Sequence, residues 1–175
     1  MNFKPTNLHD TYQIQLVKVG DQRGSFVRSF CVKEFKENGI NFSPVQINRS
    51  YNKFKHTLRG MHFQKNPHAE AKIVQCLHGS IYDVLVDLRP NSQTYLLWQG
   101  FELSSNNYQA LYVPAGLAHG FITLSDDSEI EYFMSEFFHP ESASGIRWND
   151  KKINIAWPFD PQIISDKDNT WPLLL

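Results

Sequence analysis

The sequence lacks the features that define several classes of protein. Its two cysteines, Cys31 and Cys76, lie far apart and form no CxxC pair. Two separate thiols are typical of packing residues in a reducing compartment, so we expect neither a disulfide scaffold nor a cysteine-rich zinc site. No apolar run approaches the roughly 18 residues of a membrane span, and the first residues contain no apolar stretch of a secretory signal. We therefore expect a cytoplasmic protein without a membrane partner.

Strong charge of either sign is also missing. The formal net charge is −1, and the lysines and arginines are scattered without a basic stripe. Such a surface has no field that attracts nucleic acid or an anionic membrane. The 175 residues suit one domain, 1–175, because domains commonly contain roughly 100–200 residues. A chain of this length buries a core without disulfides or a structural metal.

Aromatic residues are abundant, at 14 % of the chain, and they favour strands. Strand-like segments recur roughly every eight to twelve residues between turn signals, which is typical of a sandwich or jelly roll. Residues 31–39 have helical character, and the tail after Pro140 reads as an ordered wrap with short turns. The predicted strands are Tyr12–Val19, Ser25–Phe30, Val45–Arg49, Thr57–Phe63, Ala71–Leu77, Ser80–Leu88, Tyr95–Leu103, Gln109–Val113, His119–Leu124 and Ile130–Phe138.

The run Leu58–Gln64 places polar residues on a predicted strand. Strand alternation puts Gly60 and His62 on one face and Arg59 and Met61 on the other. A buried polar side chain needs a hydrogen-bond partner or a function. The local pattern alone slightly favours an ordinary strand with a hydrogen-bonded histidine.

Lys72 and Tyr132 also lie on predicted strands that are otherwise apolar or acidic. A lysine at the start of such a strand more commonly extends to solvent. Held in a closed pocket, its ammonium would instead stabilise an oxyanion. A buried tyrosine usually donates to a carbonyl, but a tyrosine across a pocket from a histidine can act as a general acid.

The segment Pro114–Phe121 contains a PxGxxH pattern, a tight turn that aims His119 into a barrel. The pattern is half of a signature found in metal-binding barrels. The other half would be an HxH pair, whereas His62 is followed by Phe63 and Gln64. A set of three or four histidine and carboxylate ligands is therefore not assembled, and no metal is expected.

Eight blocks of sequence, spread over almost the whole chain, resemble the RmlC family of nucleotide-diphosphate-4-keto-6-deoxyhexose 3,5-epimerases in order and spacing. The resemblance implies a cupin-type jelly-roll barrel with short peripheral helices and a homodimer formed by strand exchange. It also implies a nucleotide-diphosphate sugar as substrate and no cofactor. The blocks are Asp21–Gly24 with Phe26, Thr57–Gln64, Ala71–Val74, Tyr82–Arg89, Pro114–Phe121, Gly145–Asp150, Trp157–Phe159 and Ser165–Asp168.

The resemblance implies a role for individual residues in the inversion of C3 and/or C5 through an enolate. His62 matches the base that removes a proton next to the ketone, and Asp168 matches the carboxylate that orients it. Lys72 matches the cation beside the 4-keto oxygen, and Tyr132 the proton donor on the opposite face of the sugar. Asp83 is expected to orient His119. Residues that match substrate contacts are Gln46, Asn48, Arg59, His119 and Lys167, with Arg23 and Phe26 reaching over the base from the partner subunit.

Three departures from the family pattern leave the nucleotide base open. The family often has an acidic residue at the position of Arg28, and a carboxylate accepts from thymine N3–H where a guanidinium donates. Ala143 replaces a second acidic contact. Phe138 replaces the tyrosine that stacks on the base, and it preserves the ring face. We therefore expect Arg28 and Phe138 near the base, with a CDP- or GDP-linked sugar as an alternative to a dTDP-linked one.

Other activities also remain open from the sequence. They are an epimerase that inverts only C3 or only C5, a 3,4-ketoisomerase, a non-catalytic module that binds sugar nucleotides, and a metal-dependent cupin oxygenase. The joint presence of His62, Lys72, Tyr132 and Asp168 argues against a binding module. A binder has no need for a base, an acid and an oxyanion partner together. The end product could be a rhamnose-like surface sugar or a secondary-metabolite sugar.

Overall fold

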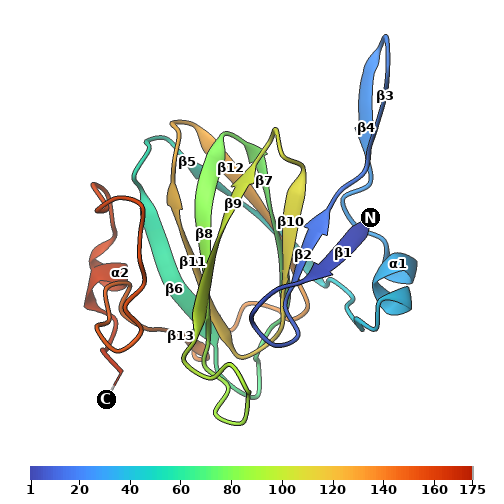
Figure 1. Cartoon of the computed structure of the whole chain (residues 1–175). Helices are drawn as coiled ribbons and strands as arrows, with labels where there is room; N and C mark the ends of the chain where they lie inside the picture. Colours follow the sequence, from blue (N-terminus) through green and yellow to red (C-terminus); the bar gives the residue numbers. More distant parts are fainter. Residues whose placement is uncertain (175) are drawn as a thin grey trace.

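Antiparallel strands form two facing sheets in the computed structural model, which describes residues 1–174 (Figure 1). The sheets enclose the interior of a jelly-roll barrel, which confirms the predicted all-β, cupin-type fold. The six-stranded sheet consists, in spatial order, of β1 (Asn2–Pro5), β2 (Tyr12–Gln15), β10 (Gln109–Val113), β7 (Lys72–His78), β12 (Ser128–Met134) and β5 (Gln46–Asn52). The five-stranded sheet consists of β13 (Ala143–Gly145), β6 (Leu58–Gln64), β11 (Leu117–Thr123), β8 (Ser80–Asp87) and β9 (Trp98–Ser104).

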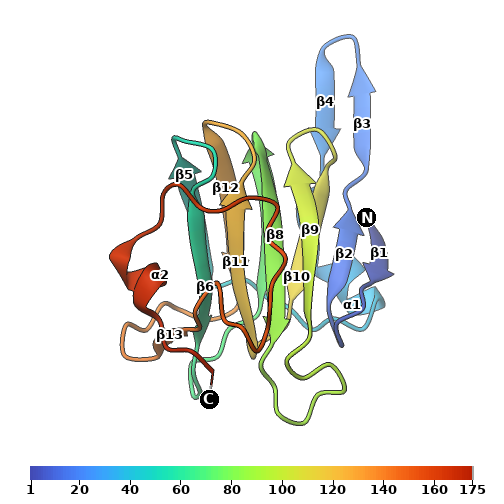
Figure 2. The same cartoon turned by 60° about the vertical axis from the view of Figure 1, so that its left-hand side comes forward.

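A hairpin of β3 (Lys18–Asp21) and β4 (Gly24–Val27) projects beyond the two sheets (Figure 2). The helices within residues 1–174 are α1 (Val32–Glu37) and α2 (Asp166–Thr170), both short and peripheral as predicted. Neither of these helices is long and apolar enough to cross a membrane.

The predicted strand Tyr12–Val19 is two strands in the structure. β2 follows β10 only as far as the pair Gln15 and Gln109, where β10 begins. Beyond that point the chain leaves the sheet, and Lys18 pairs with Val27 in the projecting hairpin. The positions of the short strands β1 and β13 and of the helix α2 were not predicted, because segments of three to five residues carry too little periodicity.

The space between the sheets is filled by apolar side chains over much of its length. Val74, Leu85, Leu103, Phe121 and Ile130 belong to this cluster, and each is at most 2 % exposed. Burial of such side chains stabilises the barrel by roughly 1.5–3 kcal/mol each relative to exposure. The polar residues of the barrel are therefore confined to the part of the interior that this cluster does not fill.

Both outer faces of the barrel are covered. Phe35 of α1 packs with Ile14 and Phe133 outside the six-stranded sheet. The tail after Pro140 packs Ile146 and Ile153 against the outside of the five-stranded sheet, as the predicted ordered wrap requires. The tail leads into α2, and α2 lies against β6 at the edge of the five-stranded sheet (Figure 2).

The pairing of β6 with β11 contains an irregularity beside the open part of the barrel. His62 pairs with His119, whereas Arg59 pairs with Phe121, so three steps along β6 match two along β11. Such a bulge reverses the alternation of side chains. Met61 packs into the outer cluster, while Arg59 Nε donates to Asn52 Oδ1 of the facing sheet at 2.6 Å. The predicted placement of Arg59 on the face opposite His62 is therefore wrong.

Candidate active site

A cavity of about 490 Å³ opens between the edges of the two sheets, beside β5, β6 and α2. The strands β5, β6, β7, β12 and β13 and the helix α2 all contribute side chains to its wall. Of the residues predicted for the site, the cavity wall includes Gln46, Asn48, His62, Lys72, Phe138 and Lys167.

His62, in the cavity wall, forms a short polar contact with Asp168 of α2. His62 Nε2 lies 2.6 Å from Asp168 Oδ1, and Asp168 is 5 % exposed. Ser165 caps α2 by accepting from the Asp168 backbone N–H at 3.1 Å, which places the Asp168 side chain toward β6. The imidazole of His62 therefore faces the cavity, and its Nε2 is held by the Asp168 carboxylate.

The Asp168 carboxylate has two further donors. The Gly60 backbone N–H donates to Oδ2 at 3.2 Å, and Trp171 Nε1 donates to Oδ1 at 3.2 Å. Burial acts to raise the pKa of Asp168, but the hydrogen bond and charge of His62 and the two other donors outweigh it. The pKa therefore lies below its usual range, and Asp168 is a carboxylate at neutral pH.

Lys72 is buried at the start of β7 rather than extended to solvent. It is 5 % exposed, and its ammonium lies 2.8 Å from Oε1 of Glu70. Glu70 also lines the cavity, although the sequence analysis did not select it. The available signal was its position two residues before Lys72, just ahead of β7. The pair places a fixed cation in the wall of the cavity that His62 faces.

Tyr132 lies on the inner face of β12, next to the cavity rather than in its wall. Its neighbour on that face, Met134, lines the cavity and pairs with Lys72. The Tyr132 ring centroid is 6.1 Å from that of His119, which pairs with His62. Burial raises the pKa of the Tyr132 phenol, and the charge of Asp83 acts in the same direction. Tyr132 is therefore protonated over the whole physiological pH range.

His119 is held by a buried carboxylate on the neighbouring strand. Its Nε2 lies 2.7 Å from Asp83 Oδ2, and Asp83 is fully buried. Burial raises the pKa of Asp83, while the charges of His119 and Lys72 act to lower it. The contact fixes one ring nitrogen of His119 and turns the ring toward Tyr132.

The sequence of this chain matches a known protein family. The family model described as dTDP-4-dehydrorhamnose 3,5-epimerase matches residues 5–175. The enzyme of that name from Escherichia coli K12 is 44 % identical over 170 residues, which cover 96 % of this chain and 91 % of that protein. This chain belongs to the dTDP-4-dehydrorhamnose 3,5-epimerase family. The family is one of isomerases, in agreement with the resemblance seen in the sequence.

Solved structures support the same family. The crystal structure of dTDP-4-dehydrorhamnose 3,5-epimerase from Bacillus anthracis, with TDP and PPi bound, has a TM-score of 0.96 and 43 % identity. The match covers 99 % of each chain. The RmlC structure from Legionella pneumophila, in complex with dTDP-4-keto-L-rhamnose, has a TM-score of 0.93 and 36 % identity, and covers 98 % of this chain and 92 % of that chain.

Three residues that the epimerase resemblance assigns to the nucleotide lie away from the cavity of their own chain. Arg23 and Phe26 are on the projecting β3–β4 hairpin, and the Phe26 side chain is 69 % exposed. Arg23 pairs with Asp21 on the same hairpin. Arg28 Nη1 lies 2.8 Å from Glu34 Oε1, outside the six-stranded sheet. Within one chain these residues and the cavity do not form a common site.

Gln64 organises the rim of the epimerase cavity, and the sequence analysis did not single it out. Its Nε2 donates to the carbonyls of His68 at 3.0 Å and Phe137 at 3.1 Å, and its Oε1 accepts from the His139 N–H at 2.6 Å. One buried side chain thereby joins the β6–β7 loop to the β12–β13 loop, which carries Phe138.

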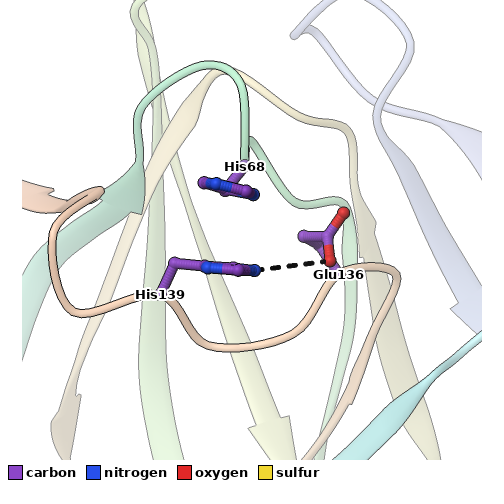
Figure 3. Close-up of side chains that lie close together, drawn as sticks. All are labelled: His68, Glu136 and His139. Carbon is purple, nitrogen blue, oxygen red and sulfur yellow. Dashed lines mark ion pairs between the residues drawn. The ribbon is translucent and has the colours of Figure 1, made fainter.

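The same two loops bring His68, Glu136 and His139 together (Figure 3). In residues 1–174 this is the one group whose three ligand atoms lie within 4.8 Å of one another. The two imidazole rings, however, are stacked, with centroids 3.5 Å apart and planes 11° apart. An imidazole nitrogen binds a metal in its ring plane, so one ion cannot lie in both planes. We assign the group to the packing of the rim.

Proposed function

We propose that this chain inverts C3 and C5 of a dTDP-linked 4-keto-6-deoxyhexose by proton transfer through an enolate. The observation that carries the proposal is that the His62–Asp168 pair and the buried ammonium of Lys72 face one cavity. The relatives solved with TDP and with dTDP-4-keto-L-rhamnose support a dTDP sugar as the substrate.

His62 would remove the proton on the carbon next to the ketone. Such a C–H is a weak acid, so the charge that develops on the 4-keto oxygen needs a partner. The Lys72 ammonium supplies it, as preorganised donors do in an oxyanion hole. Asp168 would keep His62 in one tautomer and stabilise the imidazolium that forms.

Inversion also requires a proton from the opposite face of the sugar, since otherwise the proton returns to the face it left. Tyr132 would donate it. The phenol suits this role because it is protonated at neutral pH, and because Tyr132 lies on β12 two residues before Met134, which lines the cavity.

The remaining substrate contacts are proposed from the cavity wall and its neighbours. Gln46, Asn48 and Lys167 line the cavity and would bind the diphosphate and sugar, with Arg59 and His119 beside them. Phe138 lines the cavity and would stack on the base through its ring face.

Arg23 and Phe26 would reach the base of the partner subunit in a homodimer, because the hairpin that carries them projects from its own chain. Arg28 would accompany them at that interface. The two free cysteines, Cys31 and Cys76, fit a protein of the reducing cytoplasm.

Incubation of the wild-type protein in D2O with dTDP-, CDP- and GDP-4-keto-6-deoxyglucose, followed by proton NMR, tests the proposal. We expect deuterium at both C3 and C5 and inverted configuration with the dTDP sugar. Exchange at one carbon would assign a single-centre epimerase, and a carbonyl moved to C3 a ketoisomerase. A preference for the CDP or GDP sugar would correct the base. Exchange with none of the three would refute the proposal.

A further inference from the structure

Glu70 is the buried carboxylate that holds the ammonium in the cavity. Its side chain is 4 % exposed, and its Oε1 lies 2.8 Å from Lys72 Nζ. Its other oxygen, Oε2, accepts from the backbone N–H of Gln64 on β6 at 3.0 Å. Both oxygens are thus engaged, one with a backbone group that cannot rotate away. The carboxylate is fixed, and it fixes the ammonium in turn.

We propose that Glu70 is a positioning residue for the epimerisation, acting through Lys72. This inference rests on the proposed function. A lysine side chain has four rotatable bonds and three N–H donors. Donation to Glu70 selects one place for the ammonium and leaves two donors for the carbonyl oxygen. An ammonium already in place when the enolate forms needs no reorganisation, which is the basis of oxyanion stabilisation.

The charge of Glu70 matters as well as its shape. An unpaired ammonium is costly to bury, and an adjacent carboxylate favours its charged form. Two other carboxylates beside the cavity have partners of their own: Asp83 is paired with His119 and Asp168 with His62. Within residues 1–174, Glu70 provides the one ion pair of Lys72. Besides Lys72, the charged or titratable groups in the cavity wall are His62, Glu70, Glu136 and Lys167. Those beside the wall are Arg59, Asp83, His119, Tyr132 and Asp168.

Two variants separate the charge of Glu70 from its length. Glu70→Gln keeps the size and removes the charge, whereas Glu70→Asp keeps the charge and shortens the reach. For Glu70→Gln we expect kcat for deuterium exchange to fall about 10–100-fold, below the 10²–10³ typical of deleting a stabilising donor. KM should change by less than about threefold, since the loss lies in transition-state stabilisation.

The split between kcat and KM, with partial rescue by the charge-retaining variant, gives a readout that a purely structural role would not move. Glu70→Asp keeps the carboxylate charge at a shorter reach, so its kcat should fall less than that of Glu70→Gln, again with KM changed by less than about threefold.

Glu37→Gln is the matched control, because Glu37 pairs with Lys33 on the exposed face of α1 at 3.9 Å, away from the cavity. Its kcat and KM should equal those of the wild type. A wild-type kcat in Glu70→Gln, or a lost activity that lies in KM alone, would overturn the inference. Should Glu70→Gln fail to fold, a wild-type kcat in Glu70→Asp would overturn it instead. Failure of the proposed function is distinct, since the wild type itself would then catalyse no exchange.

Discussion

Asp168 holds the ring of His62, the proposed base, in one orientation. It accepts hydrogen bonds from the ring of His62, from the backbone of Gly60 and from Trp171. Three donors outweigh the effect of burial and keep its pKa low, so the carboxylate stays ionised. An ionised carboxylate at 2.6 Å from Nε2 selects the tautomer that presents the other nitrogen, Nδ1, as a base.

Replacement of Asp168 by Asn should therefore impair the base without removing it. An amide can present N–H to the ring and favour the wrong tautomer. We expect kcat for deuterium exchange to fall about 10²–10⁴-fold, by analogy with the carboxylate of a catalytic triad. Exchange kinetics followed by NMR would measure it, with thermal unfolding as the control for folding. A rate within a few fold of the wild type would contradict the role of Asp168.

Several residues selected for this site from the sequence lie close together in the structure, but some of their contacts, such as that of Lys72 with Glu70, were not predicted. His62 and Asp168 are separated by 106 positions, and only the family resemblance paired them. No periodicity could do so, because α2 reaches β6 only after the tail has crossed the outer face of the sheet. The sequence around Lys72, taken alone, was more typical of a lysine that extends to solvent. Its burial depends on Glu70, whose second oxygen is held by the backbone of another strand.

At the scale of elements, the loop between β8 and β9 is built around Asp87. The buried carboxylate accepts from Arg89 Nη2 at 2.8 Å, from Ser92 Oγ at 2.5 Å and from Thr94 Oγ1 at 2.7 Å. Burial acts to raise the pKa of Asp87, but these hydrogen bonds outweigh it and hold the pKa well below its usual range. The loop is thus held by a charge rather than by an apolar core.

Asp87→Asn should lower the free energy of unfolding at pH 7 by about 2–3 kcal/mol. Removing one partner of a buried pair typically costs about 3–5 kcal/mol, and Arg89 is partly exposed here. A depressed pKa contributes stability above the unfolded value, near 3.9, and this contribution is lost as the pH falls. The difference between wild type and variant should therefore shrink below about pH 4.

Urea unfolding at pH 7 and pH 3 measures both parts of this expectation. Asp160→Asn, at an exposed position, is the control and should leave stability unchanged at either pH. An Asp87→Asn variant as stable as the wild type at pH 7, or a difference that grows in acid, would contradict this account of the loop.

Prediction of elements from the sequence succeeded where pairing extends along the whole segment. β10 has the predicted bounds, Gln109–Val113, because it pairs on both sides. The prediction of one strand over Tyr12–Val19 was wrong because the partner strand, β10, pairs only with its first half. The predicted faces of β6 were wrong because the bulge opposite His119 depends on the neighbouring strand. The alternation within one segment carries no information about that neighbour.

At the scale of the whole molecule, the β3–β4 hairpin is the part least explained by one chain. Val19 and Phe26 are exposed on it, and it projects beyond both sheets, while its base contacts the barrel through Lys18 and Val27 (Figure 1). Arg23 lies at its tip, beside Asp21. An exposed valine, one phenyl ring and a guanidinium on a projecting hairpin fit a site that is completed by a second copy of the chain.

A mixture of two defective variants tests this arrangement. The double variant Arg23→Ala, Phe26→Ala should bind substrate poorly, and His62→Ala should not abstract the proton. In a mixed dimer with exchanged hairpins, one of the two sites has both parts intact. Random mixing should therefore restore activity to about one quarter of the wild-type value. Activity no greater than the sum of the separate variants would show that each site is formed by one chain.

If an imidazole and a phenol act on opposite faces of one sugar, as we propose, the variant Tyr132→Phe should separate exchange from inversion. In D2O, we expect this variant to incorporate deuterium next to the ketone with the original configuration retained, because His62 still removes and returns the proton. The ratio of exchange to inversion, measured by NMR, should rise at least about tenfold over the wild type. Inversion at the wild-type rate, or loss of exchange and inversion together in a folded variant, would contradict the claim.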